Sequence, residues 1–264
     1  MLTFKKITLN EKEILEKYLK FHKERSCDFS VGVVLMWKDF YSIEYALDDD
    51  TLFMKYTSPS GNIFFPFPQG ENAEAGLDKI YDYCIENNLP PTFCFVTEND
   101  LAKLKEHFIQ VEAKDERMWA DYLYLADEII NLEGKQFRGQ RNHINKFLRH
   151  YRSYSFKQIT PADIDDVKAF FKEISKDFDK SSPYAKEDQK QSKKVIRNSG
   201  DYSMFGGALK VYNKIVGISY GEILNDTLFV HIEKADTNYF GTYQMLVNMF
   251  AKTFVNDGVK YINR

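Results

Sequence analysis

The sequence has few cysteines and no long apolar stretch, and both absences narrow what the protein can be. The longest largely apolar run extends from Phe29 to Trp37, well short of the roughly 20 residues of a membrane-spanning helix. The first residues, Met1–Lys6, show no apolar signal-peptide region. Cys27, Cys84 and Cys94 have no Cys-x-x-Cys spacing, which argues against a disulfide framework or a zinc knuckle. We therefore expect a soluble, cytoplasmic protein.

The chain also lacks a large excess of charge of either sign, because the formal net charge is only −3. A nucleic-acid-binding function therefore cannot rest on the whole chain and needs a local basic patch. With 264 residues, of which 44% are hydrophobic, the chain can bury a substantial core. This length suits one large domain or two of ordinary size, and the order of the elements favours two.

The first half of the chain reads as a helix, three strands, a helix and a strand. Helical spacing of apolar residues, strand-like runs and turn residues such as Ser58-Pro59-Ser60-Gly61 predict these elements. The predicted ranges are helix 10–23, strands 41–47, 51–57 and 62–67, helix 72–88 and strand 92–96. The three strands are expected to form an antiparallel meander with an Asp-rich turn at Asp48–Asp50.

The second half repeats this order. Thr160 and Pro161 begin a predicted helix that runs through Phe178, and the polar stretch 179–190 is expected to be an exposed loop leading into a short second helix. Strands at 203–212, 215–224 and 227–235 follow, joined by tight Asn-containing turns. A helix at 241–255 leads to a final strand at 259–262.

Three antiparallel strands followed by a helix that crosses over to a parallel strand resemble the general N-acetyltransferase (GNAT) fold. Two such halves predict an α+β (mixed α/β) protein with two tandem GNAT-like domains, each a mixed, largely antiparallel sheet flanked by helices. The expected boundaries are 1–125 for the first domain, 126–155 for a basic connecting helix and 156–264 for the second domain.

Ordered sequence blocks in the middle and near the end of the chain resemble the phosphatidylglycerol lysyltransferase C-terminal domain family. The blocks are Asp121–Tyr124, Glu128–Lys135, Arg141–Phe147, Phe229–Asp236, Tyr239–Gln244 and Tyr261–Arg264. The resemblance covers essentially the whole chain. It implies a tandem acetyltransferase-like fold and, by extension from the lysyltransferases, transfer of an aminoacyl group from aminoacyl-tRNA.

Two departures from the family affect this expectation. The membrane-spanning part of the lysyltransferases is lacking, which favours a soluble acceptor such as a small-molecule or peptide amine. The family pattern also usually continues beyond the position of Arg264. We expect no bound cofactor, with aminoacyl-tRNA or acyl-CoA serving as the donor substrate.

A basic segment at 135–152 is the local patch that the overall charge does not provide. If it is helical, its polar residues share one broad face: Arg138, Arg141, Asn142, Asn145 and Arg149. Guanidinium groups match phosphate oxygens, so this helix is a candidate tRNA-binding element. The alternative is a solvated linker helix. His143 and His150 are too few ligands for a metal site, and none is expected.

The segment that leads into the helix at 241–255 indicates which kind of donor substrate the protein could bind. In acetyltransferases this position usually carries a glycine-rich loop that binds the pyrophosphate of coenzyme A at a helix N-terminus. Here Gly241 is retained, whereas Tyr243 replaces a small residue. The bulky ring disfavours coenzyme A and suits a differently held donor, while Gly241 has the alternative role of a helix-start residue.

The strand at 227–235 carries the candidate catalytic side chains. Simple alternation places His231 and Glu233 on one face as neighbours, where they could orient an acceptor amine and remove its proton. The alternative is a buried polar pair that supports the sheet. Tyr243 is assigned with them as catalytic, and the remaining candidate substrate-binding residues are Gly241, Glu222, Lys234, Asp236, Asn263 and Arg264.

These observations leave three hypotheses. The first is an aminoacyl-tRNA-dependent transferase with an unidentified acceptor. The second is a non-catalytic module that binds RNA or another anion on a degenerate acyltransferase scaffold. The third is an acyl-CoA-dependent N-acyltransferase.

Overall fold

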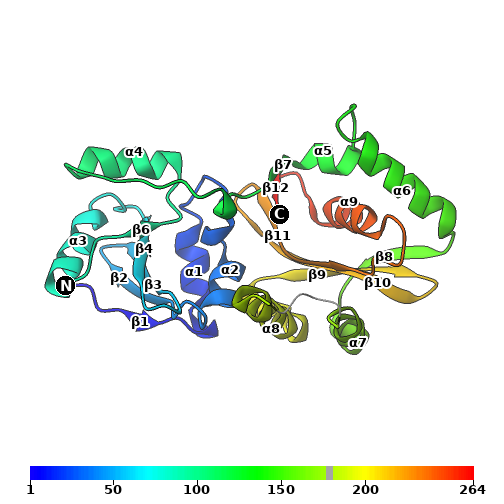
Figure 1. Ribbon diagram of the computed structural model, residues 1–264, viewed down its shortest axis with the longest axis horizontal. Helices are drawn as coiled ribbons and strands as arrows, with labels where there is room; N and C mark the ends of the chain where they lie inside the picture. Colours follow the sequence, from blue (N-terminus) through cyan, green and yellow to red (C-terminus); the bar gives the residue numbers. More distant parts are fainter. Residues whose placement is uncertain (177–180) are drawn as a thin grey trace. The chain divides into compact units, whose positions relative to one another are not determined.

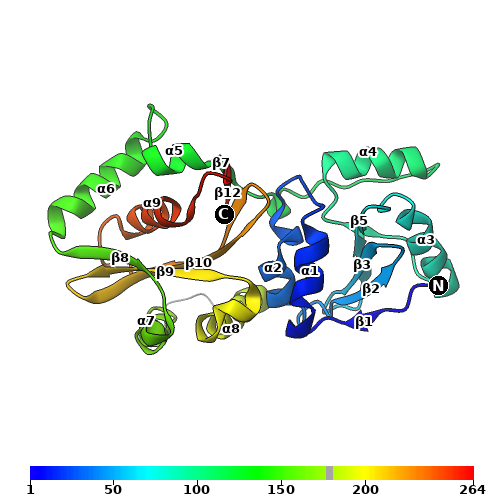
Figure 2. The same cartoon turned by 180° about the vertical axis from the view of Figure 1, so that it is seen from behind.

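The chain folds into two compact units, Met1–Asp121 and Tyr122–Arg264, each with its own mixed β-sheet. The computed structural model describes residues 1–176 and 181–264, and Figure 1 and Figure 2 show it from opposite sides. Helices flank both sheets, which confirms the predicted α+β class with two GNAT-like halves. Within the described ranges, no helix is long and apolar enough to cross a membrane.

The first unit is a sheet in the order β1-β2-β3-β4-β6, with β5 also paired to β3. Its strands are β1 (Lys5–Lys6), β2 (Glu44–Asp48), β3 (Thr51–Thr57), β4 (Ile63–Pro66), β5 (Gln69–Gly70) and β6 (Phe93–Cys94). Its helices are α1 (Lys12–Leu19), α2 (Val31–Trp37), α3 (Gly76–Glu86) and α4 (Glu98–His107). The antiparallel pairing of β2, β3 and β4 confirms the predicted meander, and β6 runs parallel to β4 after the α3 crossover.

Local sequence explains most of these elements. Asp49 and Asp50 have φ values of +48° and +49°, the left-handed conformation that a tight turn between β2 and β3 requires. Helix α4 was not predicted, although Thr97 and Asp100 form a capping box at its start. Helix α2 accounts for most of the apolar run that begins at Phe29.

The second unit is a sheet in the order β7-β12-β11-β10-β9-β8. Its strands are β7 (Leu123–Leu125), β8 (Tyr154–Gln158), β9 (Phe205–Val211), β10 (Lys214–Leu224), β11 (Thr227–Ala235) and β12 (Tyr261–Asn263). Its helices are α5 (Ala126–Asn131), α6 (Arg138–His150), α7 (Ile164–Ile174), α8 (Pro183–Arg197) and α9 (Thr242–Phe254). Short 3-10 turns across both units are Leu9–Glu11, Cys27–Phe29, Arg117–Trp119, Pro161–Asp163 and Ser199–Tyr202.

The boundary between the units falls after Asp121, whereas the sequence interpretation began a connecting helix at 126 and a second domain at 156. Strand β7 lies beyond the boundary because it pairs with β12 in antiparallel register. The basic helix α6 also belongs to the second unit, since its Phe147 is fully buried in one cluster with Leu246 of α9.

The polar stretch 179–190 is mostly helix, not the expected loop. Ser182 caps α8 through its side chain, Pro183 occupies the first turn, and the helix continues to Arg197. The expected short second helix is present, but it begins at Pro183, earlier than predicted, because the polar outer face of α8 leaves few apolar residues to mark its period. The predicted end of the preceding helix at 177–178 and the loop residues 179–180 lie outside the described residues.

The helices of the second unit are divided between the two faces of its sheet. Figure 1 shows α6 and α9 on one face and α7 and α8 on the other. Buried Leu209 of β9 and Val216 of β10 pack with α6 and α9 on the first face. The face toward which a β11 side chain points therefore decides which helices it meets.

Candidate functional site

Strand β11 contains a β-bulge in the middle of the predicted site. Tyr220 of β10 lies opposite Ile232, but its neighbour Gly221 lies opposite Val230. His231 is therefore an extra residue on β11 with no direct partner. A bulge of this kind shifts the alternation of side chains by one position beyond it.

The bulge separates the two residues that simple alternation placed together. Leu228, before the bulge, packs in one cluster with Phe250 of α9, and Glu233, after it, also lies on the α9 side beside Val247. His231 instead meets Glu222, which lies opposite Phe229 on the other face. The prediction that His231 and Glu233 are neighbours is therefore wrong, because strict alternation does not hold across a bulge.

The His231 and Glu222 side chains form a buried hydrogen-bonded pair. Nε2 of His231 lies 2.8 Å from Oε1 of Glu222, and the two side chains are only 4% and 3% exposed. The Phe229 ring is nearly parallel to the imidazole, with the ring centroids 6.2 Å apart. Buried polar groups are normally paired in this way, so the arrangement is that of a pair supporting the sheet.

Glu233 is held by a cation from the end of the chain. Nη2 of Arg264 donates to Oε1 of Glu233 at 2.6 Å. Burial raises the pKa of the Glu233 carboxyl above its usual range, while Arg264 and Lys234 oppose that rise. A buried carboxylate with a raised pKa beside an arginine is a recurrent feature of functional sites.

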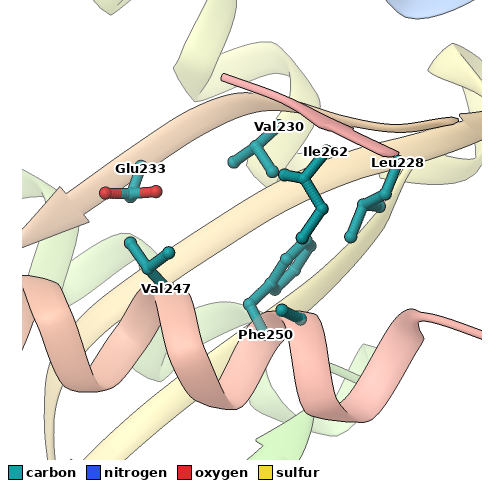
Figure 3. A pocket seen from close by; sticks show the side chains of 7 residues that line it. Leu228, Val230, Glu233, Val247, Phe250 and Ile262 are labelled. Atoms are coloured by element: carbon teal, nitrogen blue, oxygen red, sulfur yellow. The ribbon is translucent and has the colours of Figure 1, made fainter. Parts of the chain in front are cut away.

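Glu233 lines a small hollow between β11, β12 and α9, which Figure 3 shows from close by. The lining residues are Leu228, Val230, Glu233, Val247, Phe250, Ala251 and Ile262. β12 pairs with Thr227, Leu228 and Phe229 of β11, and the hollow lies beside this parallel pair, against α9. In Figure 3 the Glu233 carboxylate lies beyond Val230 at the opposite end of the hollow from Leu228.

Ser219 of β10 is a neighbour of Glu233 that the sequence analysis did not identify. The two residues are directly opposite in the β10–β11 register, which places their side chains on the same face. The Ser219 Oγ is buried and has no hydrogen-bond partner among the described residues. No sequence pattern distinguishes this serine; only the strand register identifies it.

The start of α9, where a coenzyme A pyrophosphate would be expected, is covered by α6. Gly241 has φ +71°, and a Cβ there would lie 2.3 Å from the backbone oxygen of His143 on α6. The backbone N–H of Phe240 donates to the Tyr151 hydroxyl at 3.0 Å, and the Lys146 ammonium lies 3.6 Å from the centre of the Phe240 ring. Gly241 is therefore explained by its conformation and by the close approach of α6.

The other candidates near α9 have different surroundings. Tyr243 is partly buried and packs against the cluster shared by α6 and α9, one helical turn before Val247. Asp236 accepts hydrogen bonds from the backbone and side chain of Asn238, which shapes the loop after β11. Lys234 pairs with Asp188 of α8 at 3.0 Å, on the face opposite Glu233.

The two candidates on β12 are held by the sheet. Asn263 is buried and lies opposite Leu123 on one side and Phe229 on the other. The backbone N–H of Arg264 donates to the Tyr122 carbonyl, which fixes the residue beside Glu233. Of the predicted binding residues, the structure therefore brings only Arg264 directly to Glu233.

Helix α6 presents some of its predicted polar face to the surface but not all of it. Arg138, Asn142 and Asn145 are exposed. The exposed Arg149 donates to the Asn145 carbonyl within the same helix. Arg141 is half-buried and donates to the carbonyls of Leu132 and Gly134, so it ties down the loop before the helix.

Comparison with known proteins gives a consistent result for the whole chain. The family model for phosphatidylglycerol lysyltransferase, C-terminal, matches residues 19–263. An uncharacterized protein of Mycoplasmoides gallisepticum (strain R(low / passage 15 / clone 2)) is 28% identical over 131 residues, which is 48% of this chain and 42% of that protein. The match thus spans less than half the length of that curated relative.

Two solved structures resemble the fold. A conserved protein of unknown function from Bacteroides thetaiotaomicron VPI-5482 has a TM-score of 0.91 and 28% identity, covering 100% of this chain and 90% of that one. The C-terminal domain of a protein described as a lysylphosphatidylglycerol synthetase from Agrobacterium fabrum has a TM-score of 0.61 and 8% identity, covering 97% of this chain and 79% of that one. The second likeness shows the fold alone.

Proposed function

Because this chain belongs to the phosphatidylglycerol lysyltransferase C-terminal family, we propose that it is an acyltransferase that moves an aminoacyl group from aminoacyl-tRNA to an acceptor amine. The observation that carries the proposal is the Glu233 carboxylate, which lines the hollow beside α9, has a raised pKa and is held by Arg264.

Glu233 is the proposed general base. Aminoacyl transfer needs an unprotonated amine, and a carboxylate whose pKa is raised by burial accepts a proton at a pH closer to neutrality. Arg264 keeps this carboxylate oriented through the 2.6 Å contact. Arg264 is therefore assigned as a positioning residue.

The proposed step balances without a cofactor. The acceptor nitrogen attacks the ester carbonyl carbon of the aminoacyl group, a C–N bond forms, and the amine proton passes to the Glu233 carboxylate. The ester C–O bond then breaks, and the departing ribose oxygen of the tRNA takes up that proton. Ser219, on the same face as Glu233 and with no partner for its hydroxyl among the described residues, supplies a hydrogen bond to the bound group.

His231 takes no part in this step. It lies on the opposite face and is engaged by Glu222. Tyr243 is not among the residues that line the hollow and packs instead against the cluster shared by α6 and α9. The catalytic assignment thus moves from His231, Glu233 and Tyr243 to Glu233 as the base, with Ser219 as a hydrogen-bond donor to the bound group and Arg264 as a positioning residue.

A tRNA donor is favoured over acyl-CoA because α6 covers the start of α9. The Phe240 amide, one of the N–H groups at that helix start, already donates to Tyr151. The same helix carries exposed Arg138, Asn142 and Asn145, which suit the phosphates of a larger anionic donor. An acyl-CoA donor would require α6 to move.

The test is a transfer assay with tRNA charged with labelled amino acids and a panel of amines. Glu233→Gln should slow transfer by about 100-fold or more, in line with the loss of a general base, while tRNA binding stays within about twofold of the parent. Glu173→Gln is the matched control, because Glu173 is exposed on α7 and pairs only with Lys176 among the described residues. Equal rates for Glu233→Gln and the parent protein would exclude Glu233 as the base.

The pH dependence of transfer provides a second test. Arg264 lowers the pKa of Glu233, so Arg264→Gln should raise it and move the acid limb of the pH–rate profile to higher pH. An unshifted acid limb would show that Glu233 does not control that limb.

The alternative is a non-catalytic RNA-binding module, which the exposed polar face of α6 favours. On that hypothesis tRNA binds but no charged tRNA is consumed with any amine. Substitution of Glu233 would then leave every measured property unchanged, whereas Arg138→Ala would weaken binding.

A further inference from the structure

Helix α8 carries a row of cations that the proposed site does not use. Lys186, Lys190, Lys193 and Arg197 follow one another at intervals of four, three and four residues, and all four are exposed. This spacing places them on one stripe of the helix. At about 1.5 Å per residue the row is about 16 Å long.

The acidic residues of α8 neutralise only Lys190 of this row. Glu187 binds Lys190 and Gln191, and Asp188 binds Lys234 of β11. Lys186, Lys193 and Arg197 form no ion pair with the residues that the structure describes. Three cations thus remain uncompensated along one helix of a chain with net charge −3.

A surface hollow lies along the same stripe. Its lining consists of the four row residues with Lys194 and Gln189. Gln189 is only 8% exposed, and its Nε2 has no hydrogen-bond partner in the described part of the chain. An amide N–H left without an acceptor is costly when buried, so an acceptor oxygen delivered to the hollow would relieve that cost.

The apolar residues of α8 identify which anionic partner suits the row. Val195 and Ile196 are buried inside the unit, so the helix has no apolar stripe that could lie in a bilayer beside its cations. A straight row of separated cations with a hollow between them instead suits phosphates spaced along a strand. Lysine acts as a point charge toward such phosphates and needs no fixed geometry.

We propose that the outer face of α8 binds the phosphate backbone of an RNA strand through Lys186, Lys193 and Arg197, with Gln189 donating to a phosphate oxygen in the hollow. Neither the family match nor the proposed transfer step assigns a role to this face. The binding does not depend on transfer, since α8 lies on the face of the sheet opposite α9 and Glu233 (Figure 1).

The test is binding of a fluorescently labelled single-stranded RNA between about 50 and 200 mM salt, measured by anisotropy. The triple variant Lys186→Gln/Lys193→Gln/Arg197→Gln should bind at least about tenfold more weakly at the lower salt. Its plot of log affinity against log salt should be shallower by about 2, at about 0.7 per lost phosphate contact. The matched control Lys168→Gln/Lys172→Gln/Lys176→Gln removes three exposed positive charges from α7 and the turn after it and should bind like the parent.

The variant Gln189→Leu measures the contribution of the Gln189 amide to RNA binding separately from the contribution of the cations. It removes the donor without changing net charge, so RNA binding should weaken several-fold while the salt slope stays unchanged. Thermal unfolding should show a stability equal to or above that of the parent, because the buried unpaired N–H is gone. A drop in affinity that only follows a drop in stability would remove Gln189 from the proposal.

Equal RNA binding by the parent and the α8 triple variant would overturn the proposal. It would also be overturned if phosphatidylglycerol vesicles, and no RNA, bound in a way that required the three cations. If RNA binding needs α8 but no aminoacyl group is transferred, only the proposed function fails. If transfer proceeds and the α8 variant binds RNA normally, only this inference fails.

Discussion

His231 and Glu222 lie across the β10–β11 pair with Nε2 and Oε1 2.8 Å apart, and together they occupy the face of the sheet that does not meet α9. Because both side chains are buried and bonded to each other, the histidine in this alternating strand is explained by its support of the sheet and not by catalysis. The bulge places the His231 side chain beside Glu222. Beyond the bulge, the Glu233 side chain lies on the α9 side of the sheet. One irregular residue therefore separates a supporting pair from the candidate reactive carboxylate.

The first prediction concerns this pair. His231→Ala should lower the free energy of unfolding by about 2 kcal/mol or more, because the buried Glu222 carboxyl loses its imidazole partner. A double-mutant cycle with Glu222→Gln, measured by urea unfolding, should give a coupling energy of about 1 kcal/mol or more. Additive effects of the two substitutions would show that the pair does not support the sheet.

The second prediction compares two glycines. Gly241→Ala should destabilise the second unit by more than about 1 kcal/mol, because φ is +71° and the new Cβ would meet the His143 backbone oxygen. Gly139→Ala on α6 is the control, since a Cβ there meets no atom within 4 Å, and it should stabilise by up to about 1 kcal/mol. Thermal melts of both variants measure the difference, and a neutral Gly241→Ala would contradict the close approach of α6 to α9.

The third prediction separates two arginines of α6. Arg141→Ala should mainly reduce stability, by about 1–3 kcal/mol, because its guanidinium holds the carbonyls of Leu132 and Gly134. Arg138→Ala should leave stability within about 0.5 kcal/mol, because the side chain is exposed, and should instead weaken tRNA binding. Urea unfolding and tRNA titration together make the comparison, and the reverse pattern would show that Arg141 is a binding residue.

The fourth prediction concerns pH and the first unit. Burial, together with the nearby Asp121 carboxylate, raises the pKa of Asp28 from 3.8 to about 7. Between about pH 4 and pH 7 the folded state therefore holds a proton that the unfolded chain has lost, so stability should fall as the pH rises through this window. Asp28→Asn should remove that part of the pH dependence in urea unfolding at about pH 5 and about pH 8.

The exposed Asp82→Asn provides the comparison for Asp28→Asn, and its unfolding should change with pH as the parent's does. If Asp28→Asn retained the full loss of stability between the two pH values, the raised pKa would not belong to Asp28. The partly buried thiols of Cys27 and Cys94 lie in the same region, and loss of solvation raises their pKa well above the usual value, so they remain protonated across the window.

Much of the fold could be predicted because it depends on short-range pattern. Strand β11 begins and ends where predicted, at Thr227 and Ala235, and α9 differs by one residue at each end. Apolar spacing and turn residues such as Asn213 and Asn225, both with positive φ, act within a few neighbours. Helix α8 was predicted too short and with too late a start, since its outer stripe of lysines hides the period of the few apolar residues that face inward.

The candidate site could be predicted only in part. Glu233 and Arg264 were both singled out from the sequence, but their contact depends on β12 lying beside β11, which is a long-range pairing. Ser219 was not found, because a serine in a buried strand carries no pattern until the register places it opposite Glu233. The structural role of Arg141 was also missed, because its hydrogen-bond partners are backbone carbonyl groups of the loop before α6, which no residue pattern marks.

By itself the sequence determined the α+β class, the repeated order of elements and the family, since all three follow from residue patterns that act locally or stand in fixed order. Only the tertiary structure decided which residues share a face. The bulge at His231 shifts side-chain alternation by one, and the pairing of β12 with β11 brings Arg264 to Glu233. Both depend on the register between paired strands, where a shift of one residue moves a side chain to the opposite face of the sheet.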